Sequence, residues 1–109
     1  MNKIFLSLAI ALGMAATTLH AEEAKVNYEA KCASCHGKEG KGDTVMGKKY
    51  GARDFTDLKI QATRKEEDSF KAIKEGIKKD DKFIMRPFAE KLTDAEIKAL
   101  VAYTRALAK

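Results

Sequence analysis

The chain has 109 residues, 45% of them hydrophobic, and a formal net charge of +5. That length suits one small domain, and small domains usually need a staple such as disulfides, a metal or a cofactor to be stable. The charge excess is moderate and its lysines are scattered, which suggests steering toward acidic partners and no sharper function.

Residues 1–21 are typical of a secretory signal peptide. Lys3 precedes an apolar run over residues 4–16, and the segment ends in a small residue, Ala21. The run is too short for a membrane span, which needs about 20 apolar residues. An uncleaved anchor or a buried core helix is the alternative. We expect cleavage after Ala21, export to the periplasm and one mature domain over residues 22–109, without a membrane span and away from nucleic acid.

A short helix over about 26–33 is expected to lead into the motif Cys32-Ala33-Ser34-Cys35-His36. This C-x-x-C-H pattern is the arrangement of covalent haem attachment. Two thiols three residues apart on a helical turn can add to the vinyl groups along one edge of a porphyrin, and the adjoining imidazole then reaches the iron. The sequence therefore predicts one haem c, attached at Cys32 and Cys35, with His36 as an axial iron ligand.

The two cysteines have three other interpretations. A thioredoxin-like redox pair needs a βαβ context, and no segment of five or more residues alternates like a strand. A structural zinc site needs about four ligands, whereas residues 22–109 offer only Cys32, Cys35 and His36. A surface disulfide stays open, although it would close a very small loop and leave the small core unexplained.

The segment over residues 37–57 carries five glycines and is predicted to be a long loop. Loops of this length are uncommon in compact domains unless they are functional, and a loop wrapped around a cofactor would account for this one. The loop contains Met46, which we expect to pack against the haem or to lie in solvent.

Two further helices are predicted from their capping boxes, in which a side chain and the backbone at a helix start bond reciprocally. Thr63 and Glu66 are expected to begin a middle helix that weakens or ends at Gly76; its apolar face is Phe70, Ile73 and Ile77. Thr93 and Glu96 are expected to begin the last helix. Its apolar stripe is Ile97, Leu100, Val101, Thr104 and Leu107, and Leu92 before the cap can pack on Ile97 as a hydrophobic staple.

The second axial ligand follows by elimination. His36 is the only histidine in residues 22–109, so ligation by two histidines is impossible, and the remaining methionines are Met46 and Met85. Met85 precedes Pro87, which stiffens the backbone, and is far enough along the chain to return over the opposite haem face. A methionine is more often core filler than a ligand. With haem present and no histidine to spare, Met85 is the predicted distal ligand.

These residues resemble the class I cytochrome c family over essentially the whole of residues 22–109. The matching features, in order, are the C-x-x-C-H motif, a Met-Pro-like element at 85–88 and a terminal helix. In that family an aromatic residue four positions before the first cysteine meets a leucine and an aromatic residue of the last helix. Those positions are held here by Tyr28, Leu100 and Tyr103, and the stretch 52–55 looks like the family's loop on the propionate side.

The resemblance implies an all-α cytochrome c fold, with three main helices and a glycine-rich loop around one covalent haem. The chain departs from the family in two places. Arg86 separates Met85 from Pro87, and Lys48 stands where many relatives have a proline whose carbonyl orients the imidazole. The sequence therefore identifies no acceptor for the second ring nitrogen of His36.

The expected function is a soluble electron carrier without catalytic residues. It would exchange single electrons with a donor and an acceptor redox protein, through short-lived contact at an exposed haem edge, and nothing requires more than a monomer. Basic residues that flank the ligand-bearing segments would steer that contact, and the candidates are Lys38, Lys41, Lys48, Lys49 and Lys82. The alternatives are a haem enzyme or small-molecule sensor with an open sixth position, and a domain docked permanently on a larger oxidoreductase.

Overall fold

The computed structural model describes residues 20–109. The signal peptide expected over residues 1–21 therefore lies, apart from its last two positions, outside the described residues. Within the described part, no helix is both long and apolar enough to cross a membrane.

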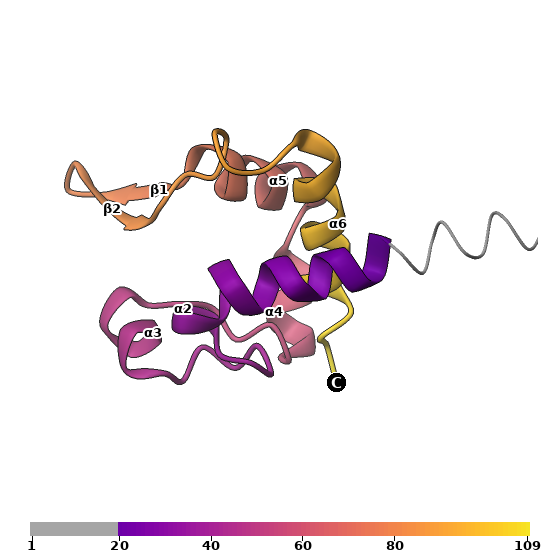
Figure 1. The fold of residues 1–109 in the computed structure, drawn as a ribbon. Helices are drawn as coiled ribbons and strands as arrows, with labels where there is room; N and C mark the ends of the chain where they lie inside the picture. Colours follow the sequence, from indigo (N-terminus) through magenta and orange to yellow (C-terminus); the bar gives the residue numbers. More distant parts are fainter. Residues whose placement is uncertain (1–19) are drawn as a thin grey trace, which may run out of the picture.

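The described chain is mostly helical, which confirms the predicted fold class (Figure 1). An N-terminal helix occupies residues 20–31, longer than the predicted 26–33. The later elements are α2 (Ala33–His36), α3 (Val45–Tyr50), α4 (Leu58–Thr63), α5 (Glu66–Glu75), β1 (Ile77–Lys79), β2 (Lys82–Met85) and α6 (Asp94–Arg105). The strands form a small hairpin that the sequence did not predict, because three or four residues are too few to show alternation.

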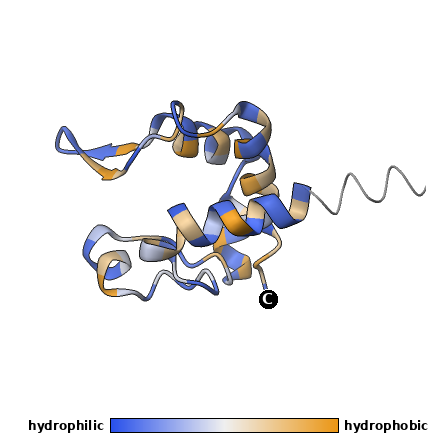
Figure 2. Ribbon diagram, in the orientation of Figure 1, coloured by the Kyte–Doolittle hydropathy of each residue, from blue (hydrophilic) through white to orange (hydrophobic). Residues whose placement is uncertain are grey.

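The N-terminal helix crosses the middle of the molecule. In Figure 1, α2, α3 and the glycine-rich loop lie on one side of it, and α5 with the β1–β2 hairpin lies on the other. Figure 2 shows hydrophobic and hydrophilic positions mixed along the helices, as expected for helices that each bury one face. The ligand-bearing segments predicted from the sequence thus lie on opposite sides of this helix.

The core lies where the N-terminal helix, α5 and α6 meet. It is a cluster of seven buried side chains: Tyr28, Phe55, Ile73, Leu92, Ile97, Leu100 and Val101. Tyr28 and Leu100 are fully buried, and the ring of Tyr28 lies 5.0 Å from that of Tyr103. The contact between the first and last helices that the family resemblance implied is therefore confirmed.

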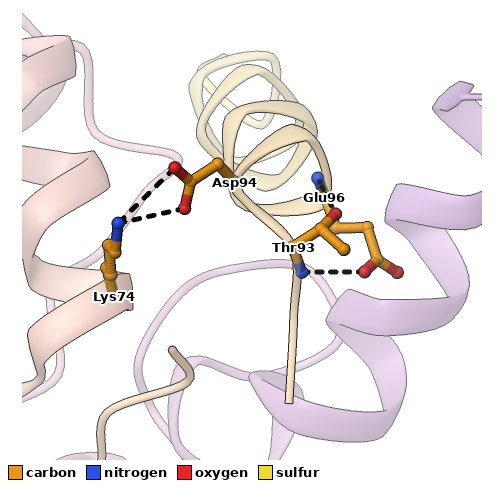
Figure 3. Close-up of polar contacts among 4 residues, drawn as sticks. All are labelled: Lys74, Thr93, Asp94 and Glu96. Atoms are coloured by element: carbon orange, nitrogen blue, oxygen red, sulfur yellow. Dashed lines mark hydrogen bonds and ion pairs between the residues drawn. The ribbon is translucent and has the colours of Figure 1, made fainter. Parts of the chain in front are cut away.

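The predicted capping box at the start of α6 is confirmed (Figure 3). The backbone N–H of Glu96 donates to the Thr93 hydroxyl at 3.1 Å, and the Thr93 N–H donates to the Glu96 carboxylate at 2.9 Å. Leu92 and Ile97, the expected staple, are both buried in the core cluster. An ion pair between Lys74 and Asp94, 3.1 Å apart, ties α5 to the start of this helix.

The predicted capping box at Thr63 is wrong. The preceding residues already form α4, so Thr63 is that helix's last residue and its hydroxyl donates backward to the Ile60 carbonyl at 2.8 Å. Helix α5 begins after Lys65 with no side-chain cap, and three acidic residues in its first turn suit the positive end of the helix dipole. It ends at Gly76, as predicted, so that Ile77 belongs to β1.

The segment 37–57 is less irregular than predicted, because it contains α3. The Thr44 hydroxyl accepts from the N–H of Gly47 at 2.9 Å to start this helix, and Gly51 ends it in a left-handed conformation. Gly47 packs so tightly on α2 that an added Cβ would overlap the carbonyl oxygen of Cys35. This glycine lets α3 approach the motif, a contact that the predicted long loop did not include.

The hairpin turns through two residues, Asp80 and Asp81. Lys79 lies opposite Lys82, and the two aspartates have φ angles of 53° and 63°. A two-residue turn with both φ angles positive is the type I′ turn of hairpins, in which Asn-Gly is the preferred pair. Aspartate can adopt this left-handed conformation, but steric strain at its Cβ costs free energy that glycine, which has no Cβ, does not lose.

Replacing Gly47 with alanine is expected to destabilise the holoprotein by about 1–3 kcal/mol, because the overlap with Cys35 outweighs alanine's better helix propensity. Urea unfolding measures the change. Gly51→Ala is the control, since nothing lies within 4 Å of its added Cβ and only its φ of 71° is unfavourable. A Gly47→Ala protein as stable as the parent would contradict the described packing.

Replacing Asp81 with glycine is expected to stabilise the holoprotein by about 1 kcal/mol, because glycine adopts the left-handed conformation without strain. Asp81→Ala is the matched control, since it removes the same carboxylate without relieving the backbone. The midpoints of urea unfolding compare the two. Equal midpoints for the two variants would show that the turn is not left-handed at this position.

Candidate functional site

The C-x-x-C-H motif continues the N-terminal helix almost without a break. The N–H of Cys32 donates to the Tyr28 carbonyl at 2.9 Å, and the N–H of His36 donates to the Cys32 carbonyl at 3.0 Å. Helix α2 then carries Cys35 and His36 on the next turn. Both thiols are free and half-buried. The structure thus brings the three residues predicted at the attachment site together on consecutive helical turns.

The Cys32 thiol has the character of a buried, protonated group. Burial raises its pKa to about 11, although nearby Lys31 lowers it in part. Cysteines of redox-active C-x-x-C motifs have a lowered pKa instead, since the thiolate is their reactive form. The two short strands of the described part also form a hairpin rather than a βαβ unit. Both observations count against a thioredoxin-like site.

His36 is held by a hydrogen bond that the sequence did not identify. Its Nδ1 lies 3.3 Å from the backbone carbonyl of Arg53, which can only accept. The proton therefore belongs on Nδ1, and Nε2 keeps the lone pair that a metal ion needs. The stretch 52–55 had been singled out only by family resemblance, and its role as the acceptor loop could not be found from spacing.

The His36 side chain is also half-buried and stacks on a neighbouring ring. Burial lowers the pKa of His36; the hydrogen bond to Arg53 opposes this shift, and the positive charge of Arg64 adds to it. The ring stacks on Phe55 with centroids 4.3 Å apart and an interplanar angle of 17°. The imidazole is therefore kept neutral and in a fixed orientation, which is the state that ligates iron.

Met85, the predicted distal ligand, ends strand β2 on the other side of the N-terminal helix. It is half-buried and packs against the core cluster, and Cys32 packs against the same cluster. Met46 lies on α3 with 42% of its surface exposed. Of the two methionines considered, Met85 is the one that contacts the core shared with the motif.

The donor set fits a covalently attached haem. Two free thiols and an imidazole with a free Nε2 lie on one turn, and large apolar side chains are exposed on α3 and on the hairpin: Val45, Met46, Ile77 and Phe83. A porphyrin offers such side chains apolar surface to cover. Among residues 20–109 no group of three His, Cys, Asp or Glu residues could hold a metal ion directly. The zinc interpretation therefore gains no support from the described part.

Comparisons with known proteins agree with this site. The sequence profile of the family described as cytochrome c oxidase, cbb3-type, subunit III matches residues 20–103. The solved structure of the KustC0563 c-type cytochrome is 38% identical, with a TM-score of 0.70, and the match covers 79% of this chain and 98% of that one. A tyrosine-to-phenylalanine mutant of Kustc0563 is 36% identical, with a TM-score of 0.68, covering 78% and 98%. No curated protein matches the chain.

The family match covers the N-terminal helix, the C-x-x-C-H motif, α5, the methionine strand and α6 up to residue 103. The structural match extends over nearly the whole of a c-type cytochrome. The chain therefore belongs to the class I c-type cytochromes, which bind haem c covalently and transfer electrons.

Proposed function

We propose that the protein is a soluble periplasmic electron carrier whose haem is attached at Cys32 and Cys35 and ligated by His36 and Met85. The observation that carries this proposal is the position of Cys32 and Met85 at the margin of one buried cluster. A flat group attached at Cys32 would lie against that cluster with His36 on one face. Met85 reaches the same cluster from strand β2, on the other side of the N-terminal helix from α2, so a second segment of the chain would be available to hold the group.

The side chains have separate roles in this proposal. When bound, the haem supplies an iron that gains or loses one electron. Cys32 and Cys35 retain the group, so that a small domain does not have to hold it by burial alone. His36 and Met85 stay in place in both oxidation states, and a methionine thioether raises the reduction potential. The core side chains exclude water from the haem environment, and this exclusion also raises the reduction potential.

The partners in this proposal are a donor and an acceptor redox protein that approach an exposed haem edge. Lys41 pairs with Glu39 at 3.3 Å, whereas no ion pair forms within residues 20–109 at four other lysines near the ligand segments: Lys38, Lys48, Lys49 and Lys82. Unpaired surface cations raise association rates with acidic partners in a salt-dependent way.

Two alternatives have weaker support. A sensor or enzyme with an open sixth position would need Met85 away from the iron, and residues 22–109 contain no second histidine to act as a distal acid or base. A domain docked on a larger oxidoreductase has one supporting observation, since the family's description names an oxidase subunit. Size-exclusion chromatography of the natively expressed protein distinguishes the docked domain from a free carrier.

Replacing Met85 with alanine is expected to remove the low-spin thioether spectrum and to lower the reduction potential, because the iron loses a ligand that favours its reduced form. Visible spectra of the oxidised and reduced protein and protein-film voltammetry measure the two effects. Met46→Ala is the matched control and should keep the parent spectrum. If instead Met46→Ala lost the thioether band while Met85→Ala kept it, the ligand would be Met46.

Replacing Cys32 and Cys35 together with serine is expected to abolish covalent haem and cooperative folding, since the attached group completes the core. Denaturing gels stained for haem and far-ultraviolet circular dichroism on heating measure the two losses. A Ser34→Ala protein is the control, because Ser34 is exposed and lies between the two cysteines. A haem-free double variant with a cooperative unfolding transition would contradict the role of haem in the core.

A further inference from the structure

We propose that Arg64 raises the reduction potential of the haem by holding an unpaired positive charge behind His36, on the outer side of Phe55. This inference rests on the proposed function only in requiring haem bound at His36. It concerns a residue that neither attaches nor ligates the haem. Arg64 would therefore be a positioning residue that sets the electrostatic environment of the ligand.

The first observation is a chain of ring contacts that ends on the iron ligand. The Arg64 guanidinium carbon lies 4.4 Å from the centre of the Phe55 ring, and that ring is stacked 4.3 Å from the His36 ring. Phe55 is only 7% exposed, so water is largely excluded between the two. A guanidinium at this distance over an aromatic face is held by a cation–π interaction. The charge and the imidazole are thus coupled across one buried ring.

The second observation is that the guanidinium is fixed in place. It donates to the Gln61 side-chain oxygen at 3.0 Å and to the Thr104 hydroxyl at 3.2 Å, and both residues are buried. Gln61 is anchored in turn, since its amide nitrogen donates to the carbonyls of Phe55 and Thr104 at 2.7 and 2.8 Å. The Arg64 backbone carbonyl accepts from Arg105 at 2.8 Å. Arg64 therefore cannot swing into solvent without breaking several bonds.

The third observation is that no carboxylate within residues 20–109 pairs with this charge. Every hydrogen-bond partner of Arg64 and Arg105 is a neutral amide, hydroxyl or carbonyl. Within residues 20–109 the only ion pairs are Lys41–Glu39 and Lys74–Asp94. Half-buried cations without carboxylate partners lower the stability of a small protein. A fixed, partly desolvated positive charge disfavours the more positive, oxidised state of a nearby iron, and solvent screens it less than it screens an exposed lysine.

The experiment compares the holoproteins of Arg64→Gln, Arg64→Lys and Lys59→Gln by voltammetry and by urea unfolding. Lys59 is an exposed cation on α4, the helix that ends directly before Arg64, so its replacement removes the same charge without the ring contacts. We expect Arg64→Gln to lower the equilibrium constant for reduction by about three- to tenfold, and Lys59→Gln by less than about twofold. Arg64→Lys should keep an equilibrium constant for reduction close to that of the parent, because lysine retains the charge. Its free energy of unfolding should fall, because lysine cannot make the forked hydrogen bonds of arginine.

Two results would overturn the proposal. One is an Arg64→Gln potential no lower than that of Lys59→Gln. The other is an Arg64→Lys potential as low as that of Arg64→Gln, which would mean that hydrogen bonding and not charge acts on the site. The potentials are measured whichever group is the sixth ligand, so a failure of the Met85 assignment would appear in the spectra and not in this comparison.

Discussion

The site depends on one buried side chain, Tyr28, which joins the motif to the core. Its ring is fully buried against α6, and its hydroxyl donates at 2.6 Å to the carbonyl of Gly37, directly after His36. The backbone carbonyl of Tyr28 accepts from the N–H of Cys32. Burial accordingly raises the pKa of the Tyr28 phenol, so its hydroxyl stays a donor. Both ends of the C-x-x-C-H turn are thereby fixed to the packing of the first and last helices.

Two contacts from outside this turn fix the state of the His36 side chain. The Arg53 carbonyl sets which nitrogen carries the proton, and the Phe55 ring sets the plane of the imidazole. Neither residue is near the motif in sequence. Both lie in the segment 37–57, in which Gly47 lets α3 pack against α2. Outer contacts of this kind orient a metal ligand and tune its basicity. In the proposed carrier, Arg64 would add the electrostatic part of that control through Phe55.

Local chemistry in the sequence was enough to predict the attachment turn, the last helix and its cap. The same reasoning failed at Thr63, because a capping pattern is meaningful only where no helix already precedes it, and α4 does. The Arg53 acceptor, the Phe55 stack and the Gln61 network depend on contacts between segments distant in sequence, which no periodicity reveals. The hairpin was missed for a simpler reason: its strands are short and its turn uses two aspartates instead of glycine.

Ligation of the haem iron by His36 and Met85 is tested most directly by the visible spectrum of the periplasmically matured protein, taken oxidised, then reduced, then reduced in carbon monoxide. A closed site with His36 and Met85 as ligands predicts a weak ferric iron–sulfur band at the red end, sharp reduced bands and no change when carbon monoxide is added. A reduced spectrum that shifts in carbon monoxide would contradict that site, because it would mean that the sixth position is accessible to an external ligand.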